Sequence, residues 1–293
     1  MTPALLAAYE LNDALVDSAA AGNLGEMSNL LGQGADPLFC DSRALVLAAR
    51  EGHAECVKLL IPISDPEATE SLALALAARR GHVECVKLLI PVSNPKANDS
   101  SALLQAAYHG RSDCVELLIP VSNPEAKDSE ALAMAAEAGR LECVRLLIPF
   151  SNPNAQSSDA LCLACGDGHI DCAKLLIPVS TQGKINAALG WSVFYGQTEC
   201  VKLLLPKATS LSIESRPLLL AIEKGHVDVL AAMIAHDPSI SSVIPLAKCC
   251  ADAEDRGNHQ VAIFLRSIMD KEAITASLSP SQQTSNPTPA ARL

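Results

Sequence analysis

A repeat of about 29 residues runs through most of this 293-residue chain and limits the folds open to it. A period this regular is typical of a solenoid, in which each copy is one small unit that buries its apolar face only against its neighbours. The sequence therefore predicts a stack of similar units rather than a domain with one central core. A glycine marks each copy: Gly22, Gly52, Gly81, Gly110, Gly139, Gly168, Gly196 and Gly225.

Each copy predicts two helices, as in "SSALLQAAYHGRSDCVELLIP" over residues 100–120. The apolar residues before Gly110 recur every three or four positions, which indicates a first helix that the glycine ends. A second apolar stripe follows and stops at Pro120, since proline cannot continue a helix. A serine at the start of each first helix is predicted to be its N-cap. These serines are Ser42, Ser71, Ser100, Ser129 and Ser158.

Segments such as "AARRGHVECVKLL" and "AIEKGHVDVL" resemble the ankyrin-repeat family, whose unit carries an "AAxxGHxxxVxxLL" core. Family units usually take 33 residues, whereas these take 29. The resemblance implies an all-α ankyrin-like helix-turn-helix solenoid of about eight or nine units with shortened inter-repeat loops. A short proline turn is expected in place of the projecting hairpin of the family.

Three segments are predicted along the chain. Residues 1–11 form a lead-in, residues 12–268 form the solenoid, and residues 269–293 form a disordered tail. The tail prediction rests on its Ser, Thr, Pro and Gln content, which leaves little to pack.

Composition narrows the class of partner. The chain has a net charge of −11 and no dense block of Lys or Arg, which disfavours nucleic acid. It has no apolar run near 18 residues, so no membrane span is expected. Eleven cysteines and the absence of a leader-like start favour a reducing compartment, and we expect a cytoplasmic monomer that binds a protein.

Six cysteines recur four residues after the repeat glycine, and the last units place Val229 and Val261 in that position. The position therefore asks for a small apolar group, and these cysteines are predicted to fill space. The segment "CLACGDGHIDC" also resembles a zinc ligand set, with Cys162, Cys165, His169 and Cys172. Packing is favoured over zinc because the repeat explains every member except Cys162. No cofactor is predicted.

The two residues before each glycine vary from unit to unit, and the resemblance implies that this position lines the concave, partner-gripping surface. "INAALGWSVFYGQTEC" gathers three of the eight aromatic residues into five positions, which suits a binding hot spot. A plug for a local packing defect is the competing interpretation. The predicted contacts are Arg50, Arg79, Arg80, Tyr108, His109, Glu137, Asp167, Trp191, Phe194, Tyr195, Glu223 and Lys224.

The predicted function is a non-catalytic protein-binding scaffold. No base, orienting partner and nucleophile remain together once the repeat is subtracted, so an enzyme is not expected. Near-identical short units also resemble those of bacterial and viral ankyrin proteins, which implies an alternative role in modulating or inhibiting a host or competitor protein. A zinc-dependent protein and a self-assembling spacer are the remaining alternatives.

Overall fold

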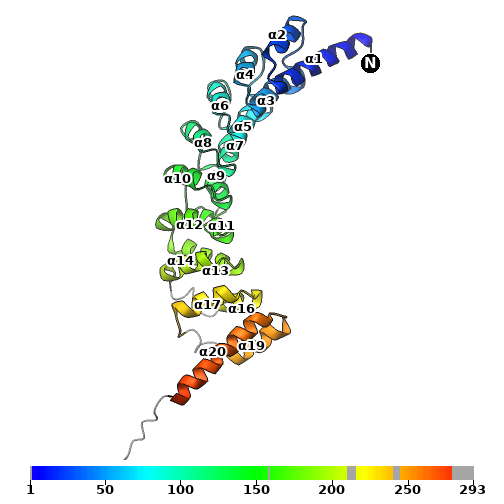
Figure 1. Cartoon of the computed structure of the whole chain (residues 1–293). Helices are drawn as coiled ribbons and strands as arrows, with labels where there is room; N and C mark the ends of the chain where they lie inside the picture. The colour runs from blue at the N-terminus through cyan, green and yellow to red at the C-terminus, as the bar shows by residue number, and fades with distance from the viewer. Residues whose placement is uncertain (1, 158, 210–215, 240–244, 279–293) are drawn as a thin grey trace, which may run out of the picture. The chain divides into compact units, whose positions relative to one another are not determined.

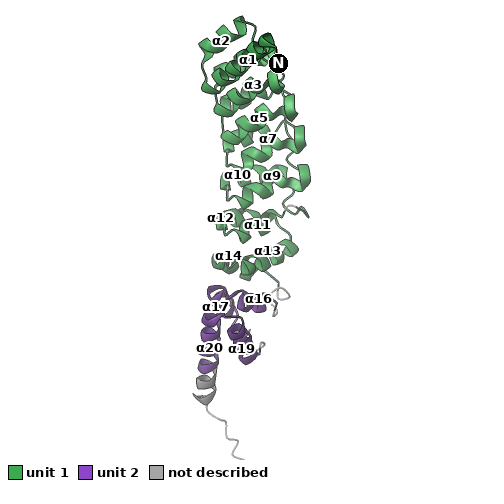
Figure 2. Cartoon of the chain, turned by 90° about the vertical axis from the view of Figure 1, so that its right-hand side faces the viewer, with its two compact units in different colours: residues 1–209 green, residues 210–293 purple. Residues whose placement is uncertain are grey.

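The computed structural model describes residues 2–157, 159–209, 216–239 and 245–278, and every regular element among them is a helix. The described chain therefore confirms the all-α prediction. It forms two compact units, residues 1–209 and residues 210–293 (Figure 2).

The first unit stacks helix pairs in two layers (Figure 1). Each first helix packs on the first helices of the adjacent repeats, and the second helices form the other layer. The first helices are α1 (Pro3–Ala21), α3 (Phe39–Glu51), α5 (Ala68–Arg80), α7 (Ala97–Tyr108), α9 (Ala126–Glu137), α11 (Ala160–Gly166) and α13 (Gln182–Phe194). The second helices are α2 (Leu24–Gly32), α4 (Ala54–Leu60), α6 (Val83–Leu89), α8 (Ser112–Leu118), α10 (Leu141–Leu147), α12 (Ile170–Leu176) and α14 (Thr198–Leu204).

Proline ends the second helices with a tight turn. In four repeats the turn is a short 3₁₀ helix with proline at its start, and no hairpin of strands occurs in the described residues. The prediction of shortened loops is therefore confirmed. These turns are η1 (Ile61–Ile63), η2 (Ile148–Phe150), η3 (Ile177–Val179) and η4 (Leu205–Lys207).

The core of each repeat is built from small and medium side chains. Ala106 and Ala107 are fully buried, as are Leu103 and Leu118 on the two helices of the same repeat. Small side chains at the alanine positions allow the first helices to pack closely. Cys114 and the equivalent cysteines are buried as free thiols, which confirms their predicted packing role: Cys56, Cys85, Cys114, Cys143, Cys172 and Cys200.

At the repeat glycines, a side chain of the next repeat crosses the glycine and donates a hydrogen bond to the preceding repeat. We call this contact the latch. Gly52 has a φ of +86°, and an added Cβ would lie 2.5 Å from the His82 ring of the next repeat. The ring crosses the glycine to place its Nε2 3.0 Å from the carbonyl oxygen of Arg50. Because a carbonyl only accepts, this nitrogen donates the hydrogen bond. His53, Arg111, Arg140 and Gln197 reach the preceding repeat in the same way.

The predicted serine N-caps are wrong for the four serines that the structure describes. Asn98, Asp99 and Ser100 form a left-handed turn with φ between 46° and 64°, inside the segment assigned to α7. The turn aims the Ser100 hydroxyl at the next repeat, where it accepts a hydrogen bond of 2.9 Å from the backbone N–H of Asn123. Ser42, Ser71 and Ser129 accept the equivalent bonds, while Ser158 lies outside the described residues.

We expect Ser100→Ala to lower the free energy of unfolding by about 1–2 kcal/mol, because the Asn123 N–H would lose its acceptor in a partly buried loop. Ser101→Ala is the matched control, since no hydrogen bond joins its hydroxyl to another described residue. Urea denaturation measures both. Equal denaturation midpoints for the two variants would contradict a stabilising role for the hydrogen bond that Ser100 accepts from the next repeat.

The sixth repeat replaces the left-handed turn with an acidic cap. Asp159 accepts a hydrogen bond of 3.1 Å from the backbone N–H of Cys162 at the start of α11. Lys184 of α13 lies 2.9 Å from the Asp159 carboxylate and donates to the Ala155 carbonyl at 2.7 Å. Both side chains are largely buried. The ion pair therefore joins the start of α11, the shortest of the described first helices, to α13.

The second unit uses the same latch. It contains α16 (Arg216–Lys224), α17 (Val227–His236), α19 (Leu246–Asp255) and α20 (His259–Leu278). Asn258 follows Gly257 and donates to the carbonyl oxygens of Ile222 and Glu223 at 3.1 and 2.9 Å.

The ends of the chain differ from the predicted segments. The lead-in over residues 1–11 is the first part of α1, which begins at Pro3 with Thr2 as its N-cap. The predicted tail begins at residue 269, yet α20 continues to Leu278. Residues 279–293, the rest of the predicted disordered tail, lie outside the described residues.

Candidate protein-binding site

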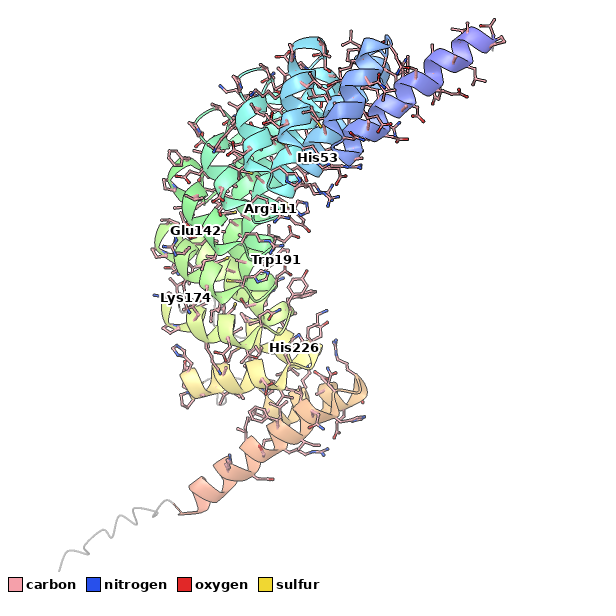
Figure 3. All side chains as sticks on the ribbon, turned by 45° about the horizontal axis from the view of Figure 1, so that its top comes forward. His53, Arg111, Glu142, Lys174, Trp191 and His226 are labelled. Carbon is pink, nitrogen blue, oxygen red and sulfur yellow. The ribbon has the colours of Figure 1, made fainter. Side chains whose placement is uncertain are left out.

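The predicted contact residues lie where each first helix ends. We define the glycine-flanking ribbon as the two residues before each repeat glycine in the first unit, the residue after it, and Trp191. Figure 3 places Arg111 and Trp191 at one side of the first unit, and Glu142 and Lys174 of the second helices at the other. The side chains of the ribbon therefore lie on the side of the first unit opposite to the second helices.

Arginines gather on the ribbon between α5 and α9. Arg79 and Arg80 are exposed at the end of α5, and Arg111 and Arg140 follow the next two repeat glycines. Arg111 Nε donates to the carbonyl oxygen of Arg79 at 3.2 Å, which brings residues of two repeats together. Arg140 Nε donates to the carbonyl oxygen of Tyr108 at 3.1 Å. These bonds hold two guanidinium groups beside the ribbon.

His109 reports how closely these charges converge. Burial lowers the pKa of His109, and the positive charges of four nearby arginines lower it further. The ring also meets Tyr108 edge to face, with centroids 5.1 Å apart. His109 is therefore neutral at pH 7, and Tyr108 is 41% exposed beside it. The four arginines are Arg79, Arg111, Arg140 and Arg80.

Aromatic rings gather on the ribbon at α13. Trp191, Phe194 and Tyr195 are 44%, 42% and 50% exposed. The Tyr195 ring lies 5.7 Å from the Trp191 ring and 5.0 Å from the Phe194 ring, measured between centroids. A Cβ added to Gly166 would lie 3.4 Å from both the Trp191 and Tyr195 rings, so these two rings rest on the end of α11.

The local core of α13 is filled without these rings. Ser192 and Val193 occupy the two alanine positions and are fully buried. The Ser192 hydroxyl donates to the carbonyl oxygen of Ala188 at 2.8 Å, so its polar group is satisfied. Phe194 and Tyr195 are exposed as the repeat register predicted. A packing plug would have buried them.

The remaining predicted contacts are dispersed. Arg50 pairs with Glu51 at 2.6 Å, so its charge is compensated locally. Glu137 is half-buried and Asp167 is exposed, each at the end of its first helix. Glu223 and Lys224 belong to the second unit, where Glu223 pairs with Arg256 at 3.2 Å.

Sequence reasoning missed three members of the site. Arg111 and Arg140 occupy the position after the glycine where other repeats place a histidine, and that departure was the available signal. Gly166 supports the aromatic rings because it stands where other repeats carry a side chain.

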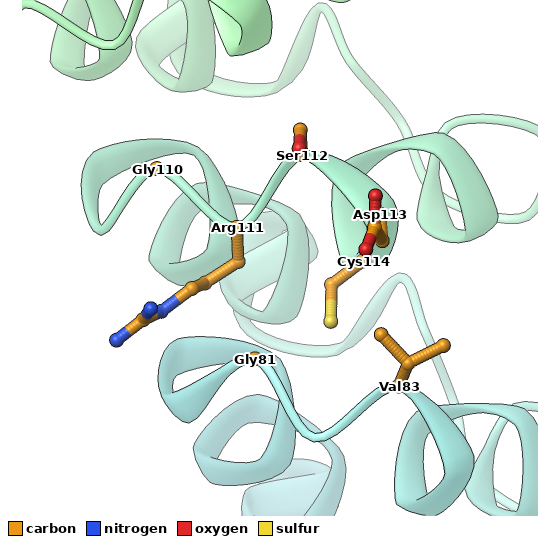
Figure 4. Close-up of a pocket in the computed structure, with 7 residues that line it drawn as sticks. All are labelled: Gly81, Val83, Gly110, Arg111, Ser112, Asp113 and Cys114. Atoms are coloured by element: carbon orange, nitrogen blue, oxygen red, sulfur yellow. The ribbon is translucent and has the colours of Figure 1, made fainter.

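A shallow pocket of about 200 Å³ lies between the third and fourth repeats (Figure 4). Figure 4 shows Arg111 passing Gly81 and pointing away from Cys114. Burial raises the pKa of the Cys114 thiol to about 11, so the thiolate needed for nucleophilic chemistry is scarce at neutral pH. The pocket is lined by Gly81, Val83, Gly110, Arg111, Ser112, Asp113 and Cys114.

The cysteine-rich segment of the sixth repeat packs as the repeat predicts. Cys162, Cys165 and Cys172 are buried, and the His169 ring lies against Gly139 as the His82 ring lies against Gly52. The neighbouring thiol of Cys200 in α14 and burial raise the pKa of Cys165. Among the described residues, no group of three or more His, Cys, Asp and Glu side chains has the arrangement of a metal site.

No described helix combines the length and apolar character needed to cross a membrane. No curated protein matches the chain. The crystal structure of the human ASB11 ankyrin repeat domain is similar in fold, with a TM-score of 0.50 and 22% identity over 56% of this chain and 83% of that one. A family model of ankyrin repeats in three copies matches residues 15–99, 45–128, 103–187, 132–215 and 161–244. The chain belongs to the ankyrin-repeat family, whose repeats are generally protein-protein interaction modules.

Proposed function

We propose that the chain is a non-catalytic scaffold that holds a partner protein against the glycine-flanking ribbon. The observation that carries the proposal is the exposed cluster of Trp191, Phe194 and Tyr195. Trp and Tyr are enriched in binding hot spots because a large, rigid ring gains much contact area when a partner covers it. Large rings exposed together on a surface commonly mark a site where a partner protein docks.

The stack suits binding to a preformed surface. Latches at the glycines and hydrogen bonds at the serines fix each repeat to the next, so the ribbon needs little ordering when a partner arrives. Arg50, Glu137 and Asp167 extend the proposed contact along the first unit, and Glu223 and Lys224 are proposed contacts on the second. Eleven cysteines, each described as a free thiol, support a reducing compartment such as the cytoplasm.

Binding chemistry fits the ribbon better than catalysis. Two of its guanidinium groups, those of Arg111 and Arg140, are anchored on carbonyl oxygens, and the thiol of Cys114 in the neighbouring pocket is held protonated. A nucleophile and its activating base are not paired there. The ribbon would serve equally to assemble a partner or to modulate its activity, and the proposal in either form is a monomer acting on another protein.

The triple variant Trp191→Ala, Phe194→Ala and Tyr195→Ala is expected to lose its partner while remaining folded, because three exposed rings contribute little to the core. Hot-spot side chains contribute about 2 kcal/mol or more each, so retention should fall at least about tenfold. Quantitative affinity capture from the source-cell lysate measures the loss for every retained protein.

Phe150→Ala is the matched control, since Phe150 is 54% exposed at the end of η2 and lies outside the ribbon. Circular dichroism and thermal melting verify that all baits are folded. A folded triple variant that retains the same proteins as the wild type and the control, in the same amounts, would refute the proposal.

A further inference from the structure

We propose that the part of the ribbon between α5 and α9 binds a carboxylate-rich segment of the partner protein. The inference rests on the proposed scaffold function and names the chemistry of what that scaffold recognises. The binding groups are the guanidinium groups of Arg79, Arg80, Arg111 and Arg140, with Tyr108 among them.

These arginines differ from most cations on the second helices. Four of those five cations pair with an acid three residues earlier, as Lys87 does with Glu84 at 2.7 Å and Lys174 with Asp171 at 2.8 Å. Arg145 and Lys202 form the same intrahelical pairs. None of the ion pairs between described residues includes Arg79, Arg80, Arg111 or Arg140. Arg79, Arg111 and Arg140 therefore offer their positive charge to a ligand. Arg80 also acts on Glu51, whose pKa is lowered by the hydrogen bond from Arg50 and by the charges of Arg50 and Arg80.

Two of the guanidinium groups are held in place for bidentate binding. Arg111 and Arg140 each use Nε to reach a carbonyl oxygen of the preceding repeat. A guanidinium bound through Nε still has the donors of its two terminal nitrogens, which match the two oxygens of a carboxylate. Fixing the side chain before binding reduces the entropy lost when a ligand arrives.

The cluster is electrostatically unfavourable until an anion neutralises it. Four positive charges act together on His109, and the acidic groups at this end of the ribbon are Glu51, which already pairs with Arg50, and the half-buried Glu137. Like charges placed this close repel, and a bound carboxylate relieves that repulsion. The gain appears only when the ligand is acidic.

A peptide segment fits the site better than a nucleic acid. The chain carries a net charge of −11, which would repel a long polyphosphate approaching the rest of its surface. The site covers two repeat steps of about 10 Å each, which an extended peptide of about six to eight residues spans. The exposed rings of α13 lie further along the same unit, where an apolar part of the same partner would bind.

The test uses the full-length chain and a fluorescein-labelled peptide of about eight alternating Glu and Ser residues, followed by fluorescence anisotropy at low salt. The Arg79→Gln, Arg111→Gln variant is expected to bind at least about tenfold more weakly than the wild type. Glutamine is compatible with the position of Arg111, because Gln197 makes the same latch by donating to Gly166 at 3.0 Å. The variant should therefore stay folded.

The Lys87→Gln, Arg145→Gln variant removes the same charge from the second helices and is the matched control. It is expected to bind the peptide within about twofold of the wild type, because its cations are paired and lie outside the ribbon. A wild type that does not bind the peptide, or equal weakening by both double variants, would overturn the inference. Tighter binding of a labelled oligothymidine than of the peptide would replace it with a nucleic-acid site.

The pKa of His109 supplies a second readout, which reports on peptide binding at this part of the ribbon. Its pKa, followed by NMR of the imidazole protons, is expected to rise when the peptide binds and to rise in the Arg79→Gln, Arg111→Gln variant, since both reduce the positive charge around the ring. An unchanged His109 pKa at peptide saturation would place the peptide elsewhere. The capture experiment with the aromatic variant remains independent, so this inference can fail while the proposed function stands.

Discussion

The Gly52→Ala variant is expected to lower the free energy of unfolding by about 2–3 kcal/mol. An alanine there would have to keep a φ of +86°, and its Cβ would lie 2.5 Å from the His82 ring. The ring would have to move and would lose its hydrogen bond to the Arg50 carbonyl oxygen. Urea denaturation followed by circular dichroism measures the change.

Gly190→Ala is the control for a glycine that lacks this role. Gly190 lies inside α13, and an added Cβ would meet no atom within 4 Å. Alanine is the better helix former, so this variant is expected to be more stable than the wild type by about 0.5–1 kcal/mol. The Gly52→Ala and His82→Ala changes should be less than additive when combined, because the first already displaces the ring. Strict additivity would contradict the latch.

Replacing Cys85, Cys114 and Cys143 together with valine is expected to reduce the loss of stability that the wild type shows at alkaline pH. Burial raises the pKa of each of these thiols from 9.0 to about 11. Between these values the unfolded chain has lost protons that the folded chain keeps. The free energy of unfolding therefore falls as pH rises from 9 to 11, whereas below pH 9 the contribution of the thiols is constant.

Each thiol contributes a slope of up to about 1.4 kcal/mol per pH unit, so the triple variant should show a visibly smaller slope in this window than the wild type. Valine suits the position because Val229 and Val261 fill it, fully buried, in the second unit. Urea denaturation of both proteins across the window gives the two slopes. If the free energy of unfolding falls with pH in parallel for the wild type and the triple valine variant, the thiols of Cys85, Cys114 and Cys143 ionise normally in the folded chain.

Local sequence was enough to predict the helix pairs and the glycines that end the first helices. Gly81 ends α5 in the left-handed conformation, and Ala77 and Ala78 are fully buried. The backbone freedom of glycine and the small size of alanine are properties of the residues themselves, so the sequence alone predicts both features. The hydrogen bonds that the serines accept from the next repeat were not predictable in this way. Three successive non-glycine residues such as Asn98, Asp99 and Ser100 disfavour a left-handed turn. The compensating hydrogen bond to Asn123 comes from 23 residues further along the chain.

The candidate site was predicted in part for similar reasons. The repeat register exposed Phe194 and Tyr195, because positions just before the glycine cannot enter the stripe that packs between repeats. The convergence of Arg111 on Arg79 depends on the latch, which joins residues 32 positions apart. The sequence shows that arginine replaces histidine there but does not show towards which repeat the side chain turns.

The central claim is that, within the first unit, the ribbon contacts the partner and the second helices with their turns do not. Site-specific photocrosslinking tests it most directly, with benzoylphenylalanine placed at Tyr195 on the ribbon or at Phe150 on η2, two aromatic positions of similar exposure. Irradiation in the source-cell lysate is predicted to give a discrete protein adduct from residue 195 and none from residue 150. The same adduct from residue 150 alone, or from both positions in equal yield, would contradict the assignment of the ribbon as the binding surface.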